Sequence, residues 1–371
     1  MTDGGGFLPE REGANYTPKP RNVETYVQQE RIRTIHFGIG AIGAEIVRAA
    51  LNNPNIEIVG AVDPHPAKAG RDLGEAAGVG RAIGVTVQHE ADALLKDVYA
   101  DVVVHTTGSS LMEVFPQLMT IISNEKSVVS SCEELSFPWI RYPDLSQRLD
   151  RRAKETGVRV LGTGVNPGFV MDLLPLMMLT VCQQVKSVRI ERVVDVSTRR
   201  IQLQRKVGVG LSVKAFQGAG GSGSLGHVGL RESLFMIADT LGWRLDDVKE
   251  TIEPVVAQVK MNTEYFSVDK GYVAGLKQAA IGMISNREAI RLDLQMSLGA
   301  ANPHDGIEIE ATPPLKLLIP GGIAGDVATA SIMANCVPTV ARSRSVGLLT
   351  MRDLPLLPYY QPKPQRGDAL G

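Results

Sequence analysis

The sequence predicts an α/β fold, with a doubly wound Rossmann domain followed by a second α+β domain built on a mostly antiparallel sheet. Two observations lead to this prediction. Between residues 31 and 163, short β-branched runs alternate with helical patterns, which is the signature of βαβ units and a parallel sheet. After that point longer amphipathic strands appear, as in an antiparallel sheet with one buried face. The chain of 371 residues is long enough for two such domains.

The first domain is expected to contain six parallel strands. Helical patterns such as that of residues 111–123 can form the crossovers between them, and six strands suffice for a complete doubly wound domain. The predicted strands are 34–37, 56–62, 85–88, 102–106, 128–130 and 158–161.

The second domain is predicted from four longer strands and one helix. A polar turn of hairpin length at 285–288 joins the last two strands. A final small-residue helix at 323–341 is expected to return to the Rossmann domain. The predicted strands are 185–196, 201–209, 272–284 and 290–298, and the helix is 229–241.

These elements divide the chain into five expected segments. The glycine-rich run 218–224 is a mobile connection, and it can be either a simple linker or a lid over an active cleft. The segments are a flexible N-terminal arm (1–30), the Rossmann domain (31–165), a substrate-binding and dimerisation domain (166–322), a C-terminal helix returning to the Rossmann domain (323–360) and a tail (361–371).

Composition excludes several classes of protein. With 39 Lys and Arg against 40 Asp and Glu, the net charge of -1 offers no general attraction to nucleic acid or to an anionic membrane. No apolar run approaches the length of a membrane span, and no apolar segment near the start resembles a signal peptide. The odd, widely spaced Cys132, Cys182 and Cys336 indicate reduced thiols in the cytoplasm and no metal site.

A glycine-rich loop follows the first predicted strand and precedes a helix. Gly38 permits the tight turn, Gly40 lets the backbone approach a pyrophosphate, and Gly43 allows close packing of helix on strand. Ala41 and Ile42 complete the loop before the helix-like segment 44–51, whose first N–H groups can hold the anion. The sequence therefore predicts a dinucleotide site.

The residues after the second strand leave the choice between NAD and NADP open. Asp63 ends that strand at the distance where an acidic residue meets the adenosine ribose, which favours NAD. Lys68, together with His65 and Arg71, can instead neutralise a 2′-phosphate, although Lys68 can equally be a solvated helix-start cation. The sequence is therefore compatible with NAD, with NADP, or with use of both.

Ligands in an open α/β sheet gather beyond the carboxyl ends of the strands, so we considered the residues that follow each later strand. Thr106, Thr107 and Gly108 let a nicotinamide ribose pass close to the backbone, although this segment can also be a helix cap. Asn166 offers an amide near the nicotinamide, or simply forms a turn. Glu133 and Glu134 follow the fifth strand, and only one of two successive carboxylates is expected to face the cleft.

Several motifs together resemble a known family. Over residues 32–355 the chain resembles the 2,4-diaminopentanoate dehydrogenases and, equally, the native amine dehydrogenases. It is also similar, more distantly, to dihydrodipicolinate reductase and homoserine dehydrogenase in architecture. The motifs are GIGAIG at 38–43, HTTGSS at 105–110, CEELSFP at 132–138, NPGF at 166–169, GHVGL at 226–230 and GLLTMRDLP at 347–355.

The resemblance implies NAD(P)-linked oxidative deamination of an amine or diamino acid to a ketone and ammonia, with reductive amination as the reverse reaction. It implies that Glu133, with Glu134 as the second choice, holds the amine nitrogen and manages protons. In the homoserine dehydrogenase pattern a lysine stands where Glu133 stands here, which favours Glu133. A carboxylate suits an ammonium substrate and a positively charged iminium.

Other candidates surround this expected cleft. Trp139, Phe169 and Met171 are expected to form an apolar wall of the substrate pocket. Arg199, with its neighbour Arg200, can bind a substrate carboxylate or be solvated, and His227 can line the cleft or cap a helix. The open sheet of the second domain is a natural dimer surface, so we expect a homodimer.

Two other functions remain compatible with the sequence. The chain can be an imine reductase or an amino-acid semialdehyde oxidoreductase, although an obvious Lys or His pair after the fifth strand is missing. It can also be a nucleotide sensor that keeps the fold without the reaction. The expected partners are a small amine or ketone and ammonia, with no nucleic acid and no membrane.

Overall fold

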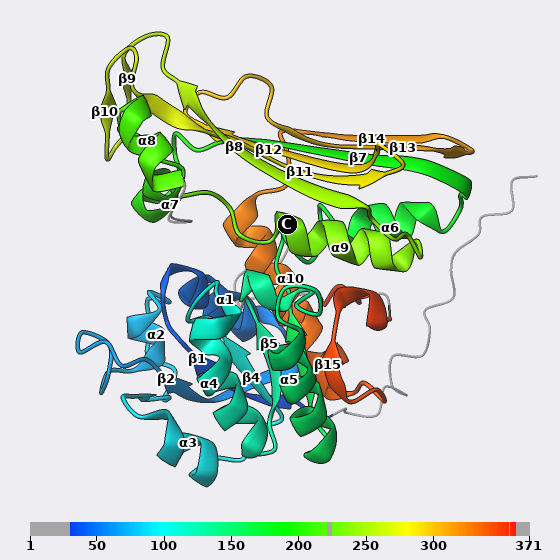
Figure 1. Cartoon of the computed structure of the whole chain (residues 1–371). Coiled ribbons are helices and arrows are strands. Elements are labelled where there is room, and N and C mark those ends of the chain that lie inside the picture. Colours follow the sequence, from blue (N-terminus) through cyan, green and yellow to red (C-terminus); the bar gives the residue numbers. More distant parts are fainter. Residues whose placement is uncertain (1–29, 221–224, 356, 361–371) are drawn as a thin grey trace, which may run out of the picture. The chain divides into compact units, whose positions relative to one another are not determined.

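The computed structural model describes residues 30–220, 225–355 and 357–360. Its first layer is a seven-stranded sheet in the order β15-β6-β5-β4-β1-β2-β3, in which every neighbouring pair is parallel. This is the classic Rossmann order with one strand added at the β6 edge (Figure 1). The strands are β1 (Ile32–Phe37), β2 (Ile56–Val62), β3 (Val87–Gln88), β4 (Val102–His105), β5 (Ser127–Ser130), β6 (Arg159–Gly162) and β15 (Gly347–Leu349).

Helices cover both faces of this sheet, as the doubly wound prediction requires. On one face α1 (Ala41–Asn52) packs against α10 (Gly325–Ala341), and both contact the strands. On the other face lie α4 (Leu111–Ser123) and α5 (Pro143–Glu155). The strands are buried from both sides, which explains their continuous β-branched runs. The shorter helical elements of this layer are α2 (Leu73–Ala76), α3 (Ala91–Asp97), η2 (Glu133–Leu135) and η3 (Met351–Asp353).

The second layer is a six-stranded sheet in the order β14-β13-β7-β12-β11-β8. It is mostly antiparallel, as predicted, with β7 and β12 as a parallel pair at its centre. Helices α6 (Leu173–Leu179) and α9 (Leu230–Thr240) lie on the face that is turned toward the first layer (Figure 1). The strands are β7 (Gln183–Asp195), β8 (Asp247–Val256), β11 (Val273–Ile284), β12 (Arg287–Ser297), β13 (His304–Thr312) and β14 (Leu315–Pro320), with a small separate pair β9 (Met261–Asn262) and β10 (Ser267–Val268).

The predicted hairpin is present in a tighter form than expected. Ser285 and Asn286 both have positive φ, of 48° and 59°, and they form the two-residue turn between β11 and β12. A turn with two left-handed residues matches the twist of the flanking strands. The turn therefore occupies only the first half of the predicted segment 285–288.

The predicted strand at 201–209 is wrong, because residues Ile201–Lys206 form a helix, α7. Apolar residues at alternate positions suggested a strand, but Leu203 and Val207 also lie four apart, as on one helix face. Gly208 and Gly210 then turn the chain with positive φ. The prediction also missed the interior strand β13 and the edge strands β8, β14 and β15; the edge strands are exposed or very short and carry a weak pattern.

The glycine-rich run lies partly in α8 (Val213–Gly220), and residues 221–224 lie outside the described residues. The predicted lid therefore stays a prediction. The predicted arm, apart from Glu30, and the predicted tail also lie outside the described residues. In the described part of the chain, no helix is long and apolar enough to cross a membrane.

The final helix α10 packs on α1 and on β5 of the first sheet. A buried ion pair holds the chain at the residue that precedes α10. Arg192 of β7 pairs with Asp305 of β13 at 2.7 Å, and the same guanidinium donates a hydrogen bond to the carbonyl of Ile323, just before α10. Asp305 in turn accepts the N–H of Ile323 at 2.7 Å. The second sheet is thereby tied to the helix that packs on the first.

Alanine substitutions at Gly43 and Gly40 are expected to differ in their effect on the free energy of unfolding. A Cβ at Gly43 would lie 2.2 Å from the carbonyl oxygen of Gly38, whereas a Cβ at Gly40 would meet nothing within 4 Å. We expect Gly43→Ala to lower the free energy of unfolding by about 1–3 kcal/mol, because the backbone of α1 must shift. Gly40→Ala should change it by less than about 0.5 kcal/mol. Urea unfolding of both variants tests this, and equal stabilities would contradict the close packing at Gly43.

Candidate functional site

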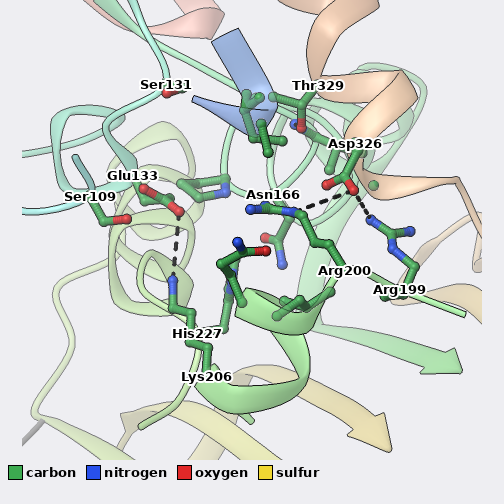
Figure 2. A pocket seen from close by; sticks show the side chains of 18 of the residues that line it. Ser109, Ser131, Glu133, Asn166, Arg199, Arg200, Lys206, His227, Asp326 and Thr329 are labelled. Atoms are coloured by element: carbon green, nitrogen blue, oxygen red, sulfur yellow. Dashed lines mark hydrogen bonds and ion pairs between the residues drawn. The ribbon is translucent and has the colours of Figure 1, made fainter. Parts of the chain in front are cut away.

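A cavity of about 370 Å³ opens where the carboxyl ends of the first sheet face α7 and the second sheet. Figure 2 shows its polar side chains converging from both layers. Several separate chain segments contribute to its wall. They are the glycine loop (Gly40, Ala41, Ile42), the segment after β4 (Thr106, Thr107, Gly108, Ser109), the segment after β5 (Ser131, Glu133), the segment after β6 (Thr163–Pro167), β7 (Arg192, Val194), α7 and its start (Arg199, Arg200, Gln202, Leu203, Lys206), His227, β12 (Leu294, Met296) and α10 (Gly325, Asp326, Thr329).

The glycine loop has the shape of an anion cradle. Gly38 has φ of +92°, and a Cβ there would lie 2.9 Å from the carbonyl oxygen of Thr106, so only glycine fits. Thr106 donates its hydroxyl hydrogen to the carbonyl of Gly38 at 2.6 Å and holds the loop against the next strand. The open space at Gly40 and the start of α1 at Ala41 leave room for a pyrophosphate at the helix N-terminus. These residues fit a dinucleotide.

Asp63 lies behind this loop and not on the cavity wall. Its carboxylate accepts the backbone N–H of Ile39 at 2.8 Å and of His65 at 2.9 Å, and pairs with Lys68 at 2.9 Å. Burial alone would raise the pKa of Asp63, but the hydrogen bonds from Lys68, His65 and Ile39 outweigh it and lower the pKa. Asp63 and Lys68 therefore lie together at the end of β2, where the sequence placed the ribose site.

A buried polar network supports Thr107. Its hydroxyl donates to Oε1 of Gln117 at 2.6 Å and lies 2.9 Å from Nε2 of His105. Nδ1 of His105 lies 2.9 Å from the hydroxyl of Ser130. Burial lowers the pKa of His105 to about 4, so the ring is neutral at physiological pH. These contacts tie the segment Thr106–Gly108 to His105 of β4 and Ser130 of β5.

The two neighbouring glutamates point in different directions. Glu133 lines the cavity, and its Oε1 lies 3.9 Å from Nζ of Lys206 (Figure 2). The side chain of Glu134 is only 5% exposed, accepts the backbone N–H of Leu111 at 2.8 Å and pairs with Arg141 at 3.2 Å. Both residues belong to η2, where three residues complete a turn, so successive side chains diverge by about 120°. Of the two, only Glu133 lies on the cavity wall.

Helix α7 supplies three cavity residues that the sequence prediction missed, Gln202, Leu203 and Lys206. Together with Arg199, which precedes the helix, they line the cavity at spacings of three, one and three residues. This is the spacing of one helix face, and it could have identified Lys206 if the segment had been interpreted as a helix. Arg199 lines the cavity, as the predicted substrate pocket requires.

The cavity carries more positive than negative side chains. Asp326, at the start of α10, pairs with Arg199 at 2.9 Å and lies 3.6 Å from Nε of Arg200 (Figure 2). Arg192 lines the wall from β7 with its charge balanced by Asp305 behind it. Asp326 was not among the predicted site residues, because its role depends on α10 returning to this position.

Asn166 and His227 contribute buried polar groups. Burial, together with the positive charges of Lys206 and Arg192, lowers the pKa of His227 to about 3, so the ring is neutral. A hydrogen bond joins its ring to the backbone of Asn166. Nε2 of His227 and Oδ1 of Asn166 have no hydrogen-bond partner among the described residues. They add hydrogen-bonding capacity beside the cavity without adding charge.

The three residues predicted as an apolar wall do not line this cavity. Met171 is fully buried in the core of the second layer, and Trp139 and Phe169 pack against that same core. The turn of residues 166–172 carries Phe169 and Met171 into this core. The apolar lining comes instead from Val194, Leu203, Leu294 and Met296 of the second layer, together with Ile42 and Val165 of the first. Among the described residues, no cluster of His, Cys, Asp and Glu could hold a metal ion.

A buried carboxylate behind Glu133 predicts a specific pH dependence of stability. Burial raises the pKa of Glu232, in the first turn of α9, from 4.5 to about 7, against the opposing attraction of Arg141. A carboxyl group whose folded pKa is raised stabilises the fold only while it is protonated. Its contribution is therefore complete below pH 4.5 and is lost as the pH rises through about 7.

We expect Glu232→Gln to raise the free energy of unfolding at pH 8 by about 1–3 kcal/mol, because ionisation of a buried group is no longer required. The difference from the wild type should shrink toward zero as the pH falls to 4.5. Chemical unfolding across this pH range measures it, with the exposed Glu253→Gln as control. A difference that is constant with pH would contradict the raised pKa.

Comparisons with known proteins agree with this geometry. Residues 169–361 match the family described as 2,4-diaminopentanoate dehydrogenase C-terminal domain, and residues 32–132 match that described as dihydrodipicolinate reductase, N-terminus. The curated 2,4-diaminopentanoate dehydrogenase of Acetoanaerobium sticklandii is 32% identical over 339 residues, covering 88% of this chain and 94% of that protein. An amine dehydrogenase of Streptomyces virginiae is 25% identical over 59% of this chain and 62% of that protein.

A solved structure shares the fold across nearly the whole chain. The amine dehydrogenase from Mycobacterium smegmatis superposes with a TM-score of 0.81 and 24% identity, over 90% of this chain and 99% of that one. The Rossmann layer and the second sheet thus share their fold with that protein. With a family match over more than half of its length, this chain belongs to the 2,4-diaminopentanoate dehydrogenase family and is an oxidoreductase that acts on amine groups with NAD(P) as its cofactor.

Proposed function

We propose that the protein deaminates an amine or a diamino acid similar to 2,4-diaminopentanoate, giving the ketone and ammonia, and catalyses the reverse reductive amination. The observation that carries this proposal is the carboxylate of Glu133 on the wall of the cleft that the glycine loop also lines. A carboxylate suits a substrate that is positively charged on nitrogen before and during the reaction.

The glycine loop, the segment Thr106–Gly108 and Asn166 would hold the cofactor. The loop leaves space beside Gly40 for the pyrophosphate, and Thr106 and Thr107 are fixed by hydrogen bonds at the level expected for the nicotinamide ribose. When bound, the nicotinamide supplies or accepts the hydride. Asp63 would meet the adenosine ribose of NAD, and Lys68 could approach a 2′-phosphate, which supports use of both NAD and NADP.

Glu133 manages the protons in this proposal. In deamination its carboxylate takes one proton from the substrate ammonium and releases it to solvent, and it then stabilises the positive charge that develops as the C–H hydrogen leaves as hydride and the C=N bond forms. Water adds to the iminium carbon, and Glu133 accepts the proton that this water loses. Glu133 returns this proton to the amino nitrogen, the C–N bond breaks, and the hydroxyl proton leaves with the ammonia as ammonium, which completes the ketone. In amination the same carboxylate takes a proton from ammonium before nitrogen attacks the carbonyl carbon.

Lys206 and the arginines provide the electrostatic setting. Nζ of Lys206 lies 3.9 Å from Oε1 of Glu133 and places a positive charge beside it. Arg199 and Arg200 outnumber the single Asp326 that pairs with them, so their side of the cavity retains positive charge. This supports a substrate with a carboxylate at the end remote from the reacting nitrogen, and the segment 166–322 as the domain that binds it.

We expect Glu133→Gln to lower kcat for reductive amination by about 10²–10⁴-fold, because the amide cannot accept a proton. The affinity for NADH should stay within about threefold, because the cofactor contacts lie on other segments. The assay follows NADH and NADPH oxidation with ammonia and a panel of ketones, and NAD(P) reduction with 2,4-diaminopentanoate. The exposed Glu57→Gln serves as control. Near-normal turnover of Glu133→Gln would exclude the assigned role.

We also propose that the protein is a cytoplasmic homodimer. Its three cysteines are free, which suits a reducing compartment. In the described part of the chain, α6 and α9 cover only one face of the second sheet (Figure 1), and the opposite face offers a surface for a second copy. Sedimentation equilibrium at micromolar concentration should give twice the chain mass of 39.9 kDa. A mass equal to that of one chain would refute the dimer.

A further inference from the structure

Behind Glu133, one arginine lies between two buried carboxylates that come from different layers. Arg141, in the segment between η2 and α5, lies 3.2 Å from Oε1 of Glu134 and 3.6 Å from Oε1 of Glu232. The Glu134 and Glu232 side chains are 5% and 1% exposed, whereas that of Arg141 is 44% exposed. The guanidinium of Arg141 remains partly hydrated and contacts both buried carboxylates. It therefore joins η2 of the first layer to α9 of the second.

On the first layer, Glu134 is held by several bonds. Its Oε2 accepts the N–H of Leu111, the first residue of α4, at 2.8 Å. The hydroxyl of Tyr142 also bonds to it, and the guanidinium of Arg141 lies over the Tyr142 ring at 5.5 Å from its centre. Because Glu134 adjoins Glu133 in a three-residue helix, its anchoring also limits where Glu133 can move.

On the second layer, Glu232 has little else to hold it. Among the described residues, no other residue makes a hydrogen bond to either of its oxygens; its own backbone N–H and the ion pair with Arg141 at 3.6 Å favour its charged form. The other charged groups that act on it, Glu134 and Glu250, repel it. Burial raises its pKa to about 7, so the fold pays in stability for this charge near neutral pH.

The start of α9 lies directly against Glu133. Gly229, the N-cap of α9, has φ of +114°, and a Cβ there would lie 2.4 Å from Cδ of Pro167 and 3.4 Å from Cβ of Glu133. His227, on the cavity wall, precedes this cap by two residues. Any displacement of the first turn of α9 would therefore change the packing around Glu133 and His227 together.

We propose that Arg141 is a positioning residue, which holds Glu133 and the start of α9 in register across the cleft by joining Glu134 to Glu232. The proposal rests on the proposed function for the role of Glu133. It explains why a carboxylate remains at position 232, where a neutral side chain would cost the fold less. Above pH 7 the ionised Glu232 pairs with Arg141, and below it protonation weakens the link.

The test compares Arg141→Met with Arg148→Met. Arg148 is also exposed and also lies over an aromatic ring, that of Phe115 at 4.8 Å, but no ion pair with a carboxylate is seen for it among the described residues. We expect Arg141→Met to lower kcat for reductive amination by about tenfold or more, because small misplacements of a reacting group are costly. The KM for NADH should change by less than about twofold. Arg141→Lys should recover most of the rate, and Arg148→Met should match the wild type.

Glu232→Gln separates positioning from a simple contribution to stability. The proposal predicts that at pH 8 this variant unfolds at a higher temperature than the wild type and yet has a kcat several-fold lower. Its kcat should also lack the decrease that the wild type shows as the pH falls through about 7. A variant that is both more stable and as fast as the wild type would overturn the proposal, as would equal kcat values for Arg141→Met and Arg148→Met.

Amide hydrogen exchange tests the link between η2 and α9 without relying on enzyme activity. If the wild type turns over none of the amines or ketones, the proposed function fails, and the link is still measured by exchange in η2 and in the first turn of α9. Arg141→Met should speed exchange in both segments by at least about fivefold, while Arg148→Met should change neither. Unchanged exchange in both segments would refute the link itself.

Discussion

The parallel order of the first sheet is the constraint on which the cleft depends. Because β1, β4, β5 and β6 run in the same direction, the residues that follow them emerge at one edge. The glycine loop, Thr106, Glu133 and Asn166 come from four separate stretches of sequence, yet all line one cavity. The second sheet then closes this edge with α7 and with the segment before α9. Neither layer alone contains the residues that the proposed chemistry requires.

Charge is distributed unevenly between the two layers of the cleft. The first layer supplies the carboxylate of Glu133, and the second supplies most of the cations, with Lys206 facing that carboxylate. Asp326, carried by the returning helix α10, partly neutralises Arg199 and Arg200. His227 remains neutral between them because burial and the neighbouring cations disfavour its protonation. The cleft can therefore hold a molecule with opposite charges at its two ends, which is the form of a diamino acid near neutral pH.

The buried region between the two layers contains a carboxylate, that of Glu232, whose ionisation lowers the stability of the fold. Glu232 lies in an environment that favours its neutral form, next to an arginine that favours its charged form. Buried charged groups without full hydrogen bonding are costly, and they are often found near functional sites. Glu232 lies one helical turn from Gly229, which packs on Glu133. The loss of stability that its ionisation causes therefore occurs at a position that contributes to the geometry of the cleft.

Local patterns in the sequence determined the first layer and most of its site. Local sequence is enough to recognise the glycine loop, the β-branched strands and the residues at the strand ends. The turn at Gly38 and the pattern of the buried strands are short-range properties. Only the tertiary structure decided which of Glu133 and Glu134 faces the cavity, since this depends on a three-residue helical turn. It also decided that α7 is a helix bearing Lys206, that Asp326 reaches the arginines, and that Trp139, Phe169 and Met171 belong to the core. These outcomes depend on packing between segments far apart in the chain, which local patterns do not encode.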